Sequence, residues 1–487
     1  MKRHELSLLA GLLLTGYAAA QPVPLPNPGI PGYQFPEPES TLMQWINQPS
    51  AAHARNIHRH GWGMWAALTM PSGQTEYGLA NAPVYLTWLT PNEVAALPAD
   101  AAANVTSALA AAPRQMRLRV PRQFMRIPGF MEKLQARLAA LSQSQDQSAR
   151  GVRDTSSFEM VGYDPSAAAF ASKNQLFSKA ALNKLYQAGN ASIPAFPSTA
   201  VTIKPVYKLV NKANMIPGTS LYVMPAWPGT PKPTPAMQSG GFPEEAWPGC
   251  VYIDAKNPGR SAAQSVDASC SSPSAANTFG LGDFIRIPIT AANAALFSSL
   301  AQNQLKQPVE PGDTLILMAM HVTSREMTEW TWQTFFWTPA PAKPPLPSSV
   351  AVAQARPAQL PWPAAHYAMS IGYQMVAPNQ PVNGGKSVGS PVTVYNPYLE
   401  ASFGSSVFQP PPPVNVGIYN SKTKTTFKGT LGIQSNCMTC HSGASVKMDS
   451  TVKPIGYATN FYIPRNAPMF KGNLQTDFLW SIADDAE

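Results

Sequence analysis

Two periodicities of apolar residues recur along this chain and predict a mixture of strands and helices. Short runs rich in branched residues or Tyr are typical of strands. They lie at 201–209, 220–224, 250–253 and 283–289, and the two strongest at 313–322 and 329–337. In the last run, Trp330, Trp332, Thr334 and Phe336 alternate with other residues. A period of two indicates that these four side chains share one face of a sheet.

Helical patterns lie before and between these strands. One helical stretch is expected from Thr41, and residues 53–68 are apolar on one side. Asp164 followed by Pro165 indicates an N-cap and a first helical position, and Gly189 would end that helix. Thr290 is expected to cap a helix running through Leu305, and a further helix is expected at residues 130–141.

The elements together predict an α+β fold in two parts. We expect a large, mixed, Pro-rich body with strands and helical insertions at 21–395, and a small C-terminal module at 396–487. Proline makes up 51 of 487 residues, about twice the usual ~5%. The 44% hydrophobic content argues against disorder, so the prolines indicate long, stiff loops.

The N-terminus has the pattern of an export signal. Lys2, Arg3 and His4 form a basic start, residues 6–17 are an apolar run too short to span a bilayer, and Ala18–Ala20 offer a cleavage site. This pattern predicts a signal peptide at 1–20, cleaved near Ala20. We therefore expect a protein exported to the periplasm.

The motif with the clearest chemistry lies near the end of the chain. Residues 437–441 read Cys-Met-Thr-Cys-His, the C-x-x-C-H pattern at which haem is attached covalently. Two thiols about one turn apart can each add to a vinyl group of the porphyrin, and the adjacent imidazole can then reach the iron. The cofactor predicted is one covalent haem c held by Cys437, Cys440 and His441.

Two other interpretations of the cysteine pair stay open. A redox dithiol expects a preceding strand and a long following helix, whereas Ser442 and Gly443 come directly after the His. A zinc site needs further thiol or imidazole ligands at finger-like spacing. The sequence has no second C-x-x-C and no following H-x3-5-H.

At this motif the chain resembles the c-type cytochromes, and more widely it is similar to large single-haem cytochrome c family proteins of bacteria. The wider resemblance is carried by residues 321–332, 394–400 and 436–441. It implies periplasmic haem binding, a mainly α C-terminal module and His441 as the proximal iron ligand. The other ring nitrogen of His441 is expected to donate to a backbone carbonyl.

The sixth iron ligand is expected at Met469. It lies in a Pro-containing loop, where the resembled family places its methionine. Met448 is an alternative, as are a distant histidine and an open site. The distant histidines are His60, His321 and His366.

A helix is expected from Leu474 to about Ala483, with Asn473 as its cap. Leu474, Phe478 and Ile482 recur at a spacing of four residues. Phe478 and Trp480 would then exclude water from the porphyrin edge.

The remaining cysteines, Cys250 and Cys270, are 20 positions apart. In an oxidising compartment they predict one disulfide, worth about 3 kcal/mol in the chain-entropy estimate. Two buried free thiols are the alternative. His53, His58 and His60 could bind a second metal such as copper, but no carboxylate or thiol lies near them in the sequence to complete such a site.

The formal net charge is +9. Lys2, Arg3 and Glu5 carry one net positive charge between them, which leaves +8 after cleavage. A modest positive field favours an acidic redox partner protein or weak association with a membrane surface, or it serves solubility alone. The cluster Arg114, Arg117, Arg119, Arg122 and Arg126 has no aromatic residues spaced for base stacking, so nucleic acid is not expected.

The expected function is electron transfer by an exported c-type cytochrome. Because the body at 21–395 is large, two alternative functions stay open. One is a haem-dependent oxidoreductase, peroxidase-like or substrate-oxidising, with an open sixth iron position. The other is a haem-based sensor of redox state or ligand.

Overall fold

The computed structural model describes residues 21–98, 114–133, 135–136, 155–302, 308–374, 392–408, 417–420, 425–428, 430–458 and 463–487. The signal peptide expected at 1–20 lies outside the described residues. So do the end of the helix expected at 130–141 and the end of the one expected to reach Leu305.

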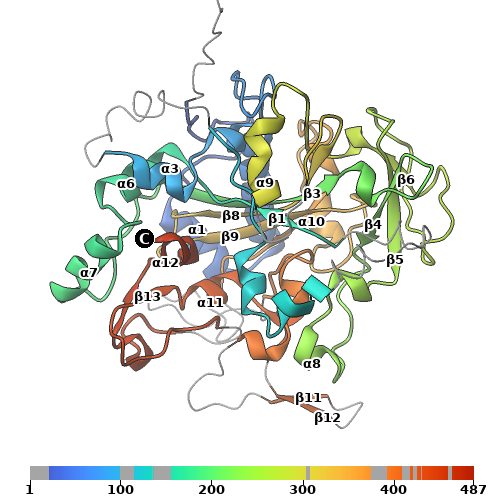
Figure 1. Ribbon diagram of the computed structural model, residues 1–487. Helices are drawn as coiled ribbons and strands as arrows, with labels where there is room; N and C mark the ends of the chain where they lie inside the picture. The colour runs from blue at the N-terminus through green and yellow to red at the C-terminus, as the bar shows by residue number, and fades with distance from the viewer. Residues whose placement is uncertain are drawn as a thin grey trace, which may run out of the picture.

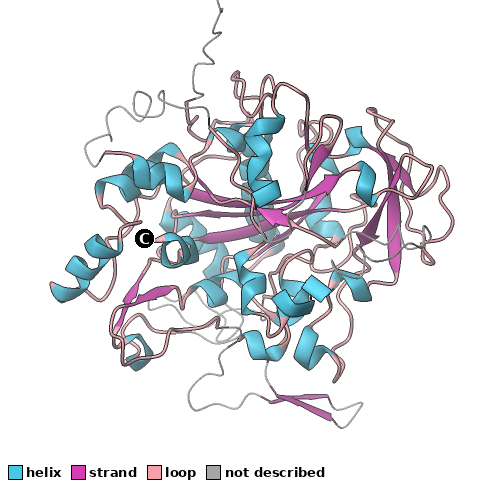
Figure 2. Ribbon diagram, in the orientation of Figure 1, coloured by secondary structure: helices cyan, strands magenta, loops and turns pink. Residues whose placement is uncertain are grey.

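Helices and strands are interspersed along the described chain, which confirms the α+β fold (Figures 1 and 2). The α-helices are α1 (Glu39–Asn47), α2 (Ala51–Thr69), α3 (Pro91–Ala96), α6 (Pro165–Lys173), α7 (Lys179–Gln187), α8 (Met237–Gly240), α9 (Ser298–Gln302), α10 (Val350–Gln354), α11 (Cys437–His441) and α12 (Trp480–Asp485). The strands are β1 (Phe158–Glu159), β2 (Gly162–Tyr163), β3 (Val201–Val210), β4 (Leu221–Ala226), β5 (Gly249–Asp254), β6 (Thr278–Gly280), β7 (Arg286–Pro288), β8 (Thr314–Ser324), β9 (Thr331–Trp337), β10 (Tyr367–Ile371), β11 (Gly417–Asn420), β12 (Thr425–Lys428), β13 (Ser445–Lys447) and β14 (Asn473–Gln475).

A central antiparallel sheet crosses the middle of the molecule in the order β1-β3-β8-β9-β10 (Figure 1). Strand β2 also pairs with β3, and β7 with β8. The strands expected at 201–209 and 313–322 are confirmed as β3 and β8. The strand expected from Glu329 begins only at Thr331, because Trp330 has a φ of 60°. That left-handed conformation belongs to a turn, not a strand.

The two faces of this sheet have different partners. On one face, the ring of Phe335 in β9 stacks on Trp65 of α2, with centroids 4.4 Å apart. On the same side, the Gln333 amide lies 3.1 Å from Met64 Sδ. The opposite face of β3, β8 and β9 is turned toward the C-terminal segment, shown in red in Figure 1.

Two predicted helices differ from expectation. The Asp164 carboxylate caps α6 by accepting from Ala167 N at 2.7 Å, as predicted. The single helix expected up to Gly189 is wrong, because Gln175, with a φ of 50°, separates α6 from α7. The helix expected from Thr290 becomes a 3-10 turn at Ala294–Phe297 followed by α9. Asn293 accepts from Thr290 N, so that segment starts as a side-chain turn.

The helix expected at Leu474–Ala483 is also wrong. Leu474 lies in β14, which pairs with β13, and α12 begins only at Trp480. Asp477 and Phe478 have φ values of 47° and 69°. Two successive left-handed residues cannot belong to a right-handed helix. The described residues of the C-terminal segment are therefore built from short strands, turns, α11 and α12. Within these residues the mainly α character that the cytochrome resemblance implies is not seen.

The C-terminal segment shares its hydrophobic cores with the body. Met438, Leu479 and Ile482 pack in one cluster with Trp330 and Trp332 of the body. Ala444, Tyr457 and Trp480 belong to the large cluster around the central sheet. A smaller cluster of C-terminal residues alone contains Ile455, Ala458, Ile463 and Phe470. The division at residue 395 stays a prediction, and these contacts hold its two parts together.

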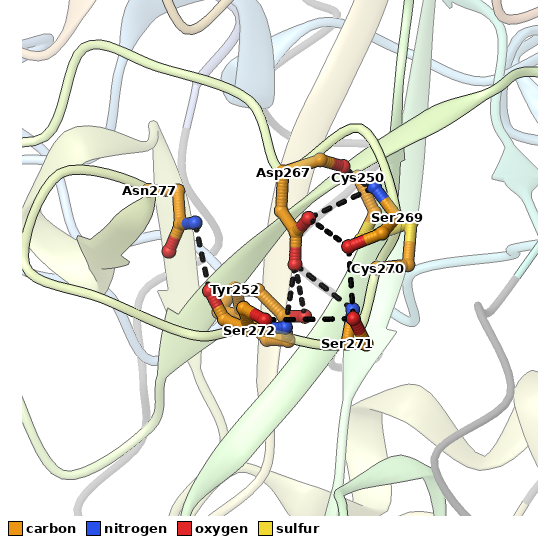
Figure 3. Close-up of a disulfide and its surroundings, with 8 residues drawn as sticks. All are labelled: Cys250, Tyr252, Asp267, Ser269, Cys270, Ser271, Ser272 and Asn277. Atoms are coloured by element: carbon orange, nitrogen blue, oxygen red, sulfur yellow. Dashed lines mark hydrogen bonds between the residues drawn. A yellow bond between two sulfur atoms is a disulfide. The ribbon is translucent and has the colours of Figure 1, made fainter.

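A second sheet, in the order β4-β5-β6, carries the disulfide between Cys250 and Cys270 (Figure 3). Their Cα atoms are 5.5 Å apart, so the predicted pairing is confirmed. Asp267 organises the loop: its carboxylate accepts from the backbone N–H groups of Ser269, Ser271 and Ser272. These hydrogen bonds hold the pKa of Asp267 well below its usual range.

Arg114, Arg119, Arg122 and Arg126 of the arginine cluster form ion pairs within the protein. Arg114 is buried between Glu76, at 2.9 Å, and Glu93, at 2.7 Å. Arg119 and Arg122 each lie 2.6 Å from Asp485 at the end of α12. The two pairs with Asp485 join the body to the end of α12. In the part of the chain that the structure describes, no helix combines the length and apolar character that a membrane crossing requires.

Candidate functional site

The Cys-Met-Thr-Cys-His motif forms a single short helix, α11, held at its start by Asn436. The Asn436 side-chain oxygen accepts from Thr439 N at 3.1 Å, the usual N-cap contact. Its amide nitrogen donates to the carbonyl oxygens of Val392, at 2.8 Å, and Gln374, at 3.0 Å. A helical turn places Cys437 and Cys440 on the same side, and both line one cavity.

His441 has one ring nitrogen held by the backbone. Its Nδ1 lies 2.7 Å from the carbonyl oxygen of Phe478, which confirms the predicted contact. Burial lowers the pKa of His441 to about 3, so the imidazole is neutral at physiological pH. With the Nδ1 proton donated to Phe478, Nε2 keeps a free lone pair, as a metal ligand requires.

The Phe478 carbonyl is aimed at His441 by the left-handed turn at Asp477 and Phe478. Such a conformation costs of order 1–3 kcal/mol for a residue with a side chain. Asp477 holds the turn in place. Its carboxylate accepts from Arg325 Nε at 3.2 Å and from Arg465 at 2.9 Å. The strained residues, Asp477 and Phe478, are therefore the ones whose backbone orients the ring of His441.

The cavity lies between the central sheet and the C-terminal segment. The space inside it that the centre of a water molecule can reach is about 100 Å³. Cys437, Cys440 and His441 form one wall, and Leu479 and Trp480 form part of another. A bulky group would fit this narrow space only if side chains in the wall moved apart.

The sheet contributes an unusual polar wall to the cavity. Lys204 of β3 pairs with His321 of β8, and Thr202 pairs with Thr323. Thr323 also pairs with Trp332 of β9. Directly paired residues of antiparallel strands share a face. All five side chains line the cavity.

The ring of Trp332 is in contact with the motif. Its centroid lies 4.2 Å from that of His441, at an interplanar angle of 42°. Its indole N–H donates to Glu329 O at 2.8 Å, which fixes the ring. Trp332 thus connects the sheet directly to the C-x-x-C-H segment.

A buried carboxylate neutralises the positive charge beside the cavity. Glu159, fully buried, lies 2.6 Å from Lys204 Nζ and 3.3 Å from Arg119 Nε. It also accepts from Arg122 N at 3.1 Å. Lys204 Nζ additionally donates to Gln123. Lys204 and Arg119 therefore each interact with a carboxylate or amide oxygen beside the cavity.

His321 has its own carboxylate partner in the cavity. Its Nε2 lies 3.1 Å from Glu400 Oε1. Glu400 also accepts from Gln123 Nε2 at 2.9 Å and from Asn396 N at 2.8 Å. Burial acts to raise the pKa of Glu400, but His321 and the Asn396 N–H outweigh it and leave the pKa below its usual value.

The two thiols of the motif are not activated. Burial, followed by the charge of Glu400, raises the pKa of Cys437 well above its usual value and also raises the pKa of Cys440. Both cysteines are free, and Cys437 Sγ donates to Val394 O at 3.4 Å. Redox dithiols instead have a lowered thiol pKa, so this environment does not favour the dithiol interpretation.

The methionines considered as sixth ligand lie elsewhere. Met469 packs against the small C-terminal cluster that contains Ile455 and Phe470. Met448 packs against the cluster that contains Trp332 and Leu474. Neither is among the residues that line the cavity, whereas His321 is.

The other histidines are also placed away from the cavity. His60 is buried in α2 between Tyr373 Oη, at 2.6 Å, and Glu326, at 3.0 Å. His366 stacks on Trp337 with ring centroids 5.1 Å apart, and the Nδ1 of His53 lies 2.5 Å from Gln48 O. Within the described ranges, no three His, Cys, Asp or Glu side chains are grouped so that they could hold a metal ion.

Comparison with protein-family models, with curated proteins and with solved structures found no match to this chain. The resemblance to c-type cytochromes therefore rests on residues of the sequence alone. The three stretches that carry it, 321–332, 394–400 and 436–441, all contribute side chains to the cavity.

Sequence reasoning missed Lys204, Glu159 and Glu400 as residues of the site. One feature of the sequence could have identified Lys204 and His321: each is an ionisable residue inside a strand run made up mostly of apolar residues. A buried sheet face needs a partner for each such residue. The carboxylates come from other segments of the chain, and only the fold brings them to the cavity.

Proposed function

We propose that this protein is an exported c-type cytochrome that carries one haem attached through Cys437 and Cys440. The observation that supports this most is the geometry of His441, a neutral imidazole fixed through Nδ1 on the Phe478 carbonyl and placed in the same cavity as both thiols. This is how a proximal haem ligand is prepared.

The types of residue around the motif suit a porphyrin, and side chains of the cavity wall would have to move apart to admit it. Two thiols on one helical turn would bond the vinyl groups, and His441 would bind the iron. Trp332, Trp480 and Leu479 supply apolar wall area. Apolar walls limit water at a haem and so tune its redox potential. When bound, the haem supplies a one-electron redox centre, and the protein holds it and controls its surroundings.

The proposed role is electron transfer in the periplasm. The export pattern at 1–20 and covalent haem attachment call for the same compartment. A mature net charge of +8, from +9 less the one charge of the signal, suits an acidic redox partner.

A second candidate function is a haem-dependent oxidoreductase with an open sixth position. The polar wall of Lys204, His321 and Glu400 favours it, because a pure carrier has little use for buried charges beside its cofactor. The two functions differ in whether a protein side chain would fill the sixth coordination position of the haem iron.

The proposal is tested by export of the full chain in a host that attaches haem c. Mature protein denatured on a gel should keep a haem stain, because thioether bonds survive unfolding. The C437S/C440S double variant should lose the stain, while a C250S/C270S control keeps it. Mature wild-type protein without bound haem would contradict the proposal.

A further inference from the structure

A second cavity, which we call the apolar cavity, lies between the 3-10 turn at Arg122–Arg126 and helix α8 (Figure 1). The space inside it that the centre of a water molecule can reach is about 390 Å³. Cavities of this size and with mostly apolar walls are typical of sites for small molecules. The apolar part of the wall is formed by Val120, Phe124, Ile127, Phe130, Pro243 and Pro397.

The apolar cavity is separate from the cavity at the Cys-Met-Thr-Cys-His motif, although the two are neighbours. Gln123 lines the motif cavity and the next residue, Phe124, lines the apolar cavity. In the same way Glu400 lines the first and Ser402 the second. The two cavities have no lining residue in common. The second one therefore needs an explanation of its own.

Two hydroxyl groups in the wall of the apolar cavity are buried without a partner. Tyr398 and Ser157 both line it and are 2% and 4% exposed. Neither Tyr398 Oη nor Ser157 Oγ has a hydrogen-bond partner among the described residues. Buried polar groups are rarely left in this state, because the lost hydrogen bonds to water are not replaced. Two of them in one cavity indicate that a bound molecule supplies the missing partner.

The ring of Tyr398 is held in place for such a contact. It packs edge-to-face on Trp247, with ring centroids 5.2 Å apart, and its backbone N–H donates to Asn396 Oδ1 at 3.0 Å. Burial, followed by the charge of Glu244, raises the pKa of Tyr398 well above its usual value. The hydroxyl therefore keeps its proton and can donate it to a hydroxyl or carbonyl oxygen.

The charges around the apolar cavity favour an uncharged ligand. Lys208, which is fully buried, lies 2.9 Å from the Glu244 carboxylate and donates to Ser156 O at 3.2 Å. The other charged residues in the wall, Lys133 and Glu245, are exposed and opposite in sign. The charges of the described residues thus balance. A bound ion would gain no buried counter-charge to offset the water that it loses.

We infer that the apolar cavity binds an uncharged small molecule that has an apolar ring system and one hydroxyl or carbonyl group. Phe124 and Phe130, with ring centroids 5.3 Å apart, supply aromatic surface for the ring system. Tyr398 and Ser157 supply hydrogen bonds for the oxygen. The inference does not depend on haem, because neither the two cysteines nor the histidine of the motif lines this cavity.

The test is equilibrium dialysis of the purified, full-length mature protein against three probes with the same rings. α-Naphthol carries a hydroxyl group, naphthalene lacks it, and α-naphthoate carries a negative charge. α-Naphthol should bind in a saturable manner and about tenfold more tightly than naphthalene, the difference expected for one hydrogen bond to a buried group. α-Naphthoate should bind more weakly than α-naphthol, because the cavity offers no free positive charge in its interior.

Two variants test the wall directly. Tyr398→Phe keeps the ring on Trp247 and removes only the hydroxyl, so it should weaken α-naphthol binding about tenfold and leave naphthalene binding unchanged. Gly240 also lines the cavity, and a Cβ placed there would meet nothing within 4 Å. Gly240→Leu should therefore fold normally, fill part of the space and weaken the binding of both probes.

Tyr395→Phe is the matched control. Tyr395 is a buried tyrosine of the same segment, but its hydroxyl pairs with Thr230 at 2.5 Å and it does not line the apolar cavity. Both affinities should stay at the wild-type value in this variant, and circular dichroism should show the wild-type fold in all three.

Four results would overturn the inference. They are the absence of saturable α-naphthol binding, equal affinities for α-naphthol and naphthalene, an unchanged α-naphthol affinity in Tyr398→Phe, and unchanged affinities in a folded Gly240→Leu protein. Each is measured on protein with or without haem. Failure of this inference is therefore distinguishable from failure of the proposed function.

Discussion

His441 shows how much a single residue depends on distant parts of the chain. The motif fixes its place next to Cys440, but its orientation comes from the Phe478 carbonyl, 37 residues later. That carbonyl is aimed by a strained turn, which Arg325 and Arg465 hold through Asp477. The sequence predicted a carbonyl partner for this ring, because a haem-ligating histidine needs one, but it could not identify which carbonyl.

Glu329 provides a pH-dependent test of burial next to this site. It lies 4% exposed just before β9, and its backbone oxygen accepts from Trp332. Burial is the main cause that raises its pKa from 4.5 to about 7, with Arg465 opposing it and Glu39 adding to it. The native protein therefore keeps a proton on Glu329 at pH values where the unfolded chain has released it.

We therefore predict that the Glu329→Gln variant has a higher free energy of unfolding than the wild type at neutral pH. Between pH 4.5 and 7 the native state binds the extra proton, so the free energy of unfolding falls as pH rises. A shift of this size corresponds to about 3 kcal/mol. Urea unfolding at pH 4.5 and 7.5 should show the variant gaining up to that amount over wild type at the higher pH. An equal pH dependence in both proteins would contradict the prediction.

The cavity shows which residues of the candidate site could be predicted from the sequence and which could not. Cys437, Cys440 and His441 are contiguous, so their shared role is visible in the sequence. Lys204 and His321 are 117 positions apart, and their pairing depends on the register between β3 and β8, which shifts between Val206 and Tyr207. Spacing along the chain contains no information about that register.

At the scale of elements, strands were predicted better than helices. Strands β3 and β8 are buried along almost their whole length, and this burial on both faces is visible in the sequence as continuous, mostly apolar runs. The terminal helix was predicted from three residues spaced by four, Leu474, Phe478 and Ile482. That spacing also arises when a short strand, a turn and a short helix each bury one residue. Asp477 accepts hydrogen bonds from arginines that only the tertiary structure brings near.

The disulfide between Cys250 and Cys270 allows a prediction about the stability of a single sheet. Cys250 and Cys270 close a loop on the β4-β5-β6 sheet (Figure 3). Replacing both by Ser should lower the free energy of unfolding by about 3 kcal/mol in the chain-entropy estimate. Chemical denaturation measures this loss. The haem spectrum should not change, because neither cysteine lines the cavity. Unaltered stability, or an altered spectrum, would contradict this account.

At the scale of the whole molecule, the cavity belongs to both parts of the chain. The sheet supplies Lys204, His321 and Trp332, and the C-terminal segment supplies the motif and Trp480. The large body therefore has a direct role in the proposed site: it forms half of the cavity wall. A self-contained cytochrome module would not need these contacts, and no pattern along the chain indicates that the two parts share hydrophobic cores.

The central claim is that haem is bonded covalently to Cys437 and Cys440 in the exported protein. The most direct measurement is the intact mass of denatured mature protein, followed by peptide mapping. The account predicts the mass of residues 21–487 plus one haem, located on the peptide that contains both cysteines. A mass equal to the polypeptide alone, with Cys437 and Cys440 both free to be alkylated, would contradict it.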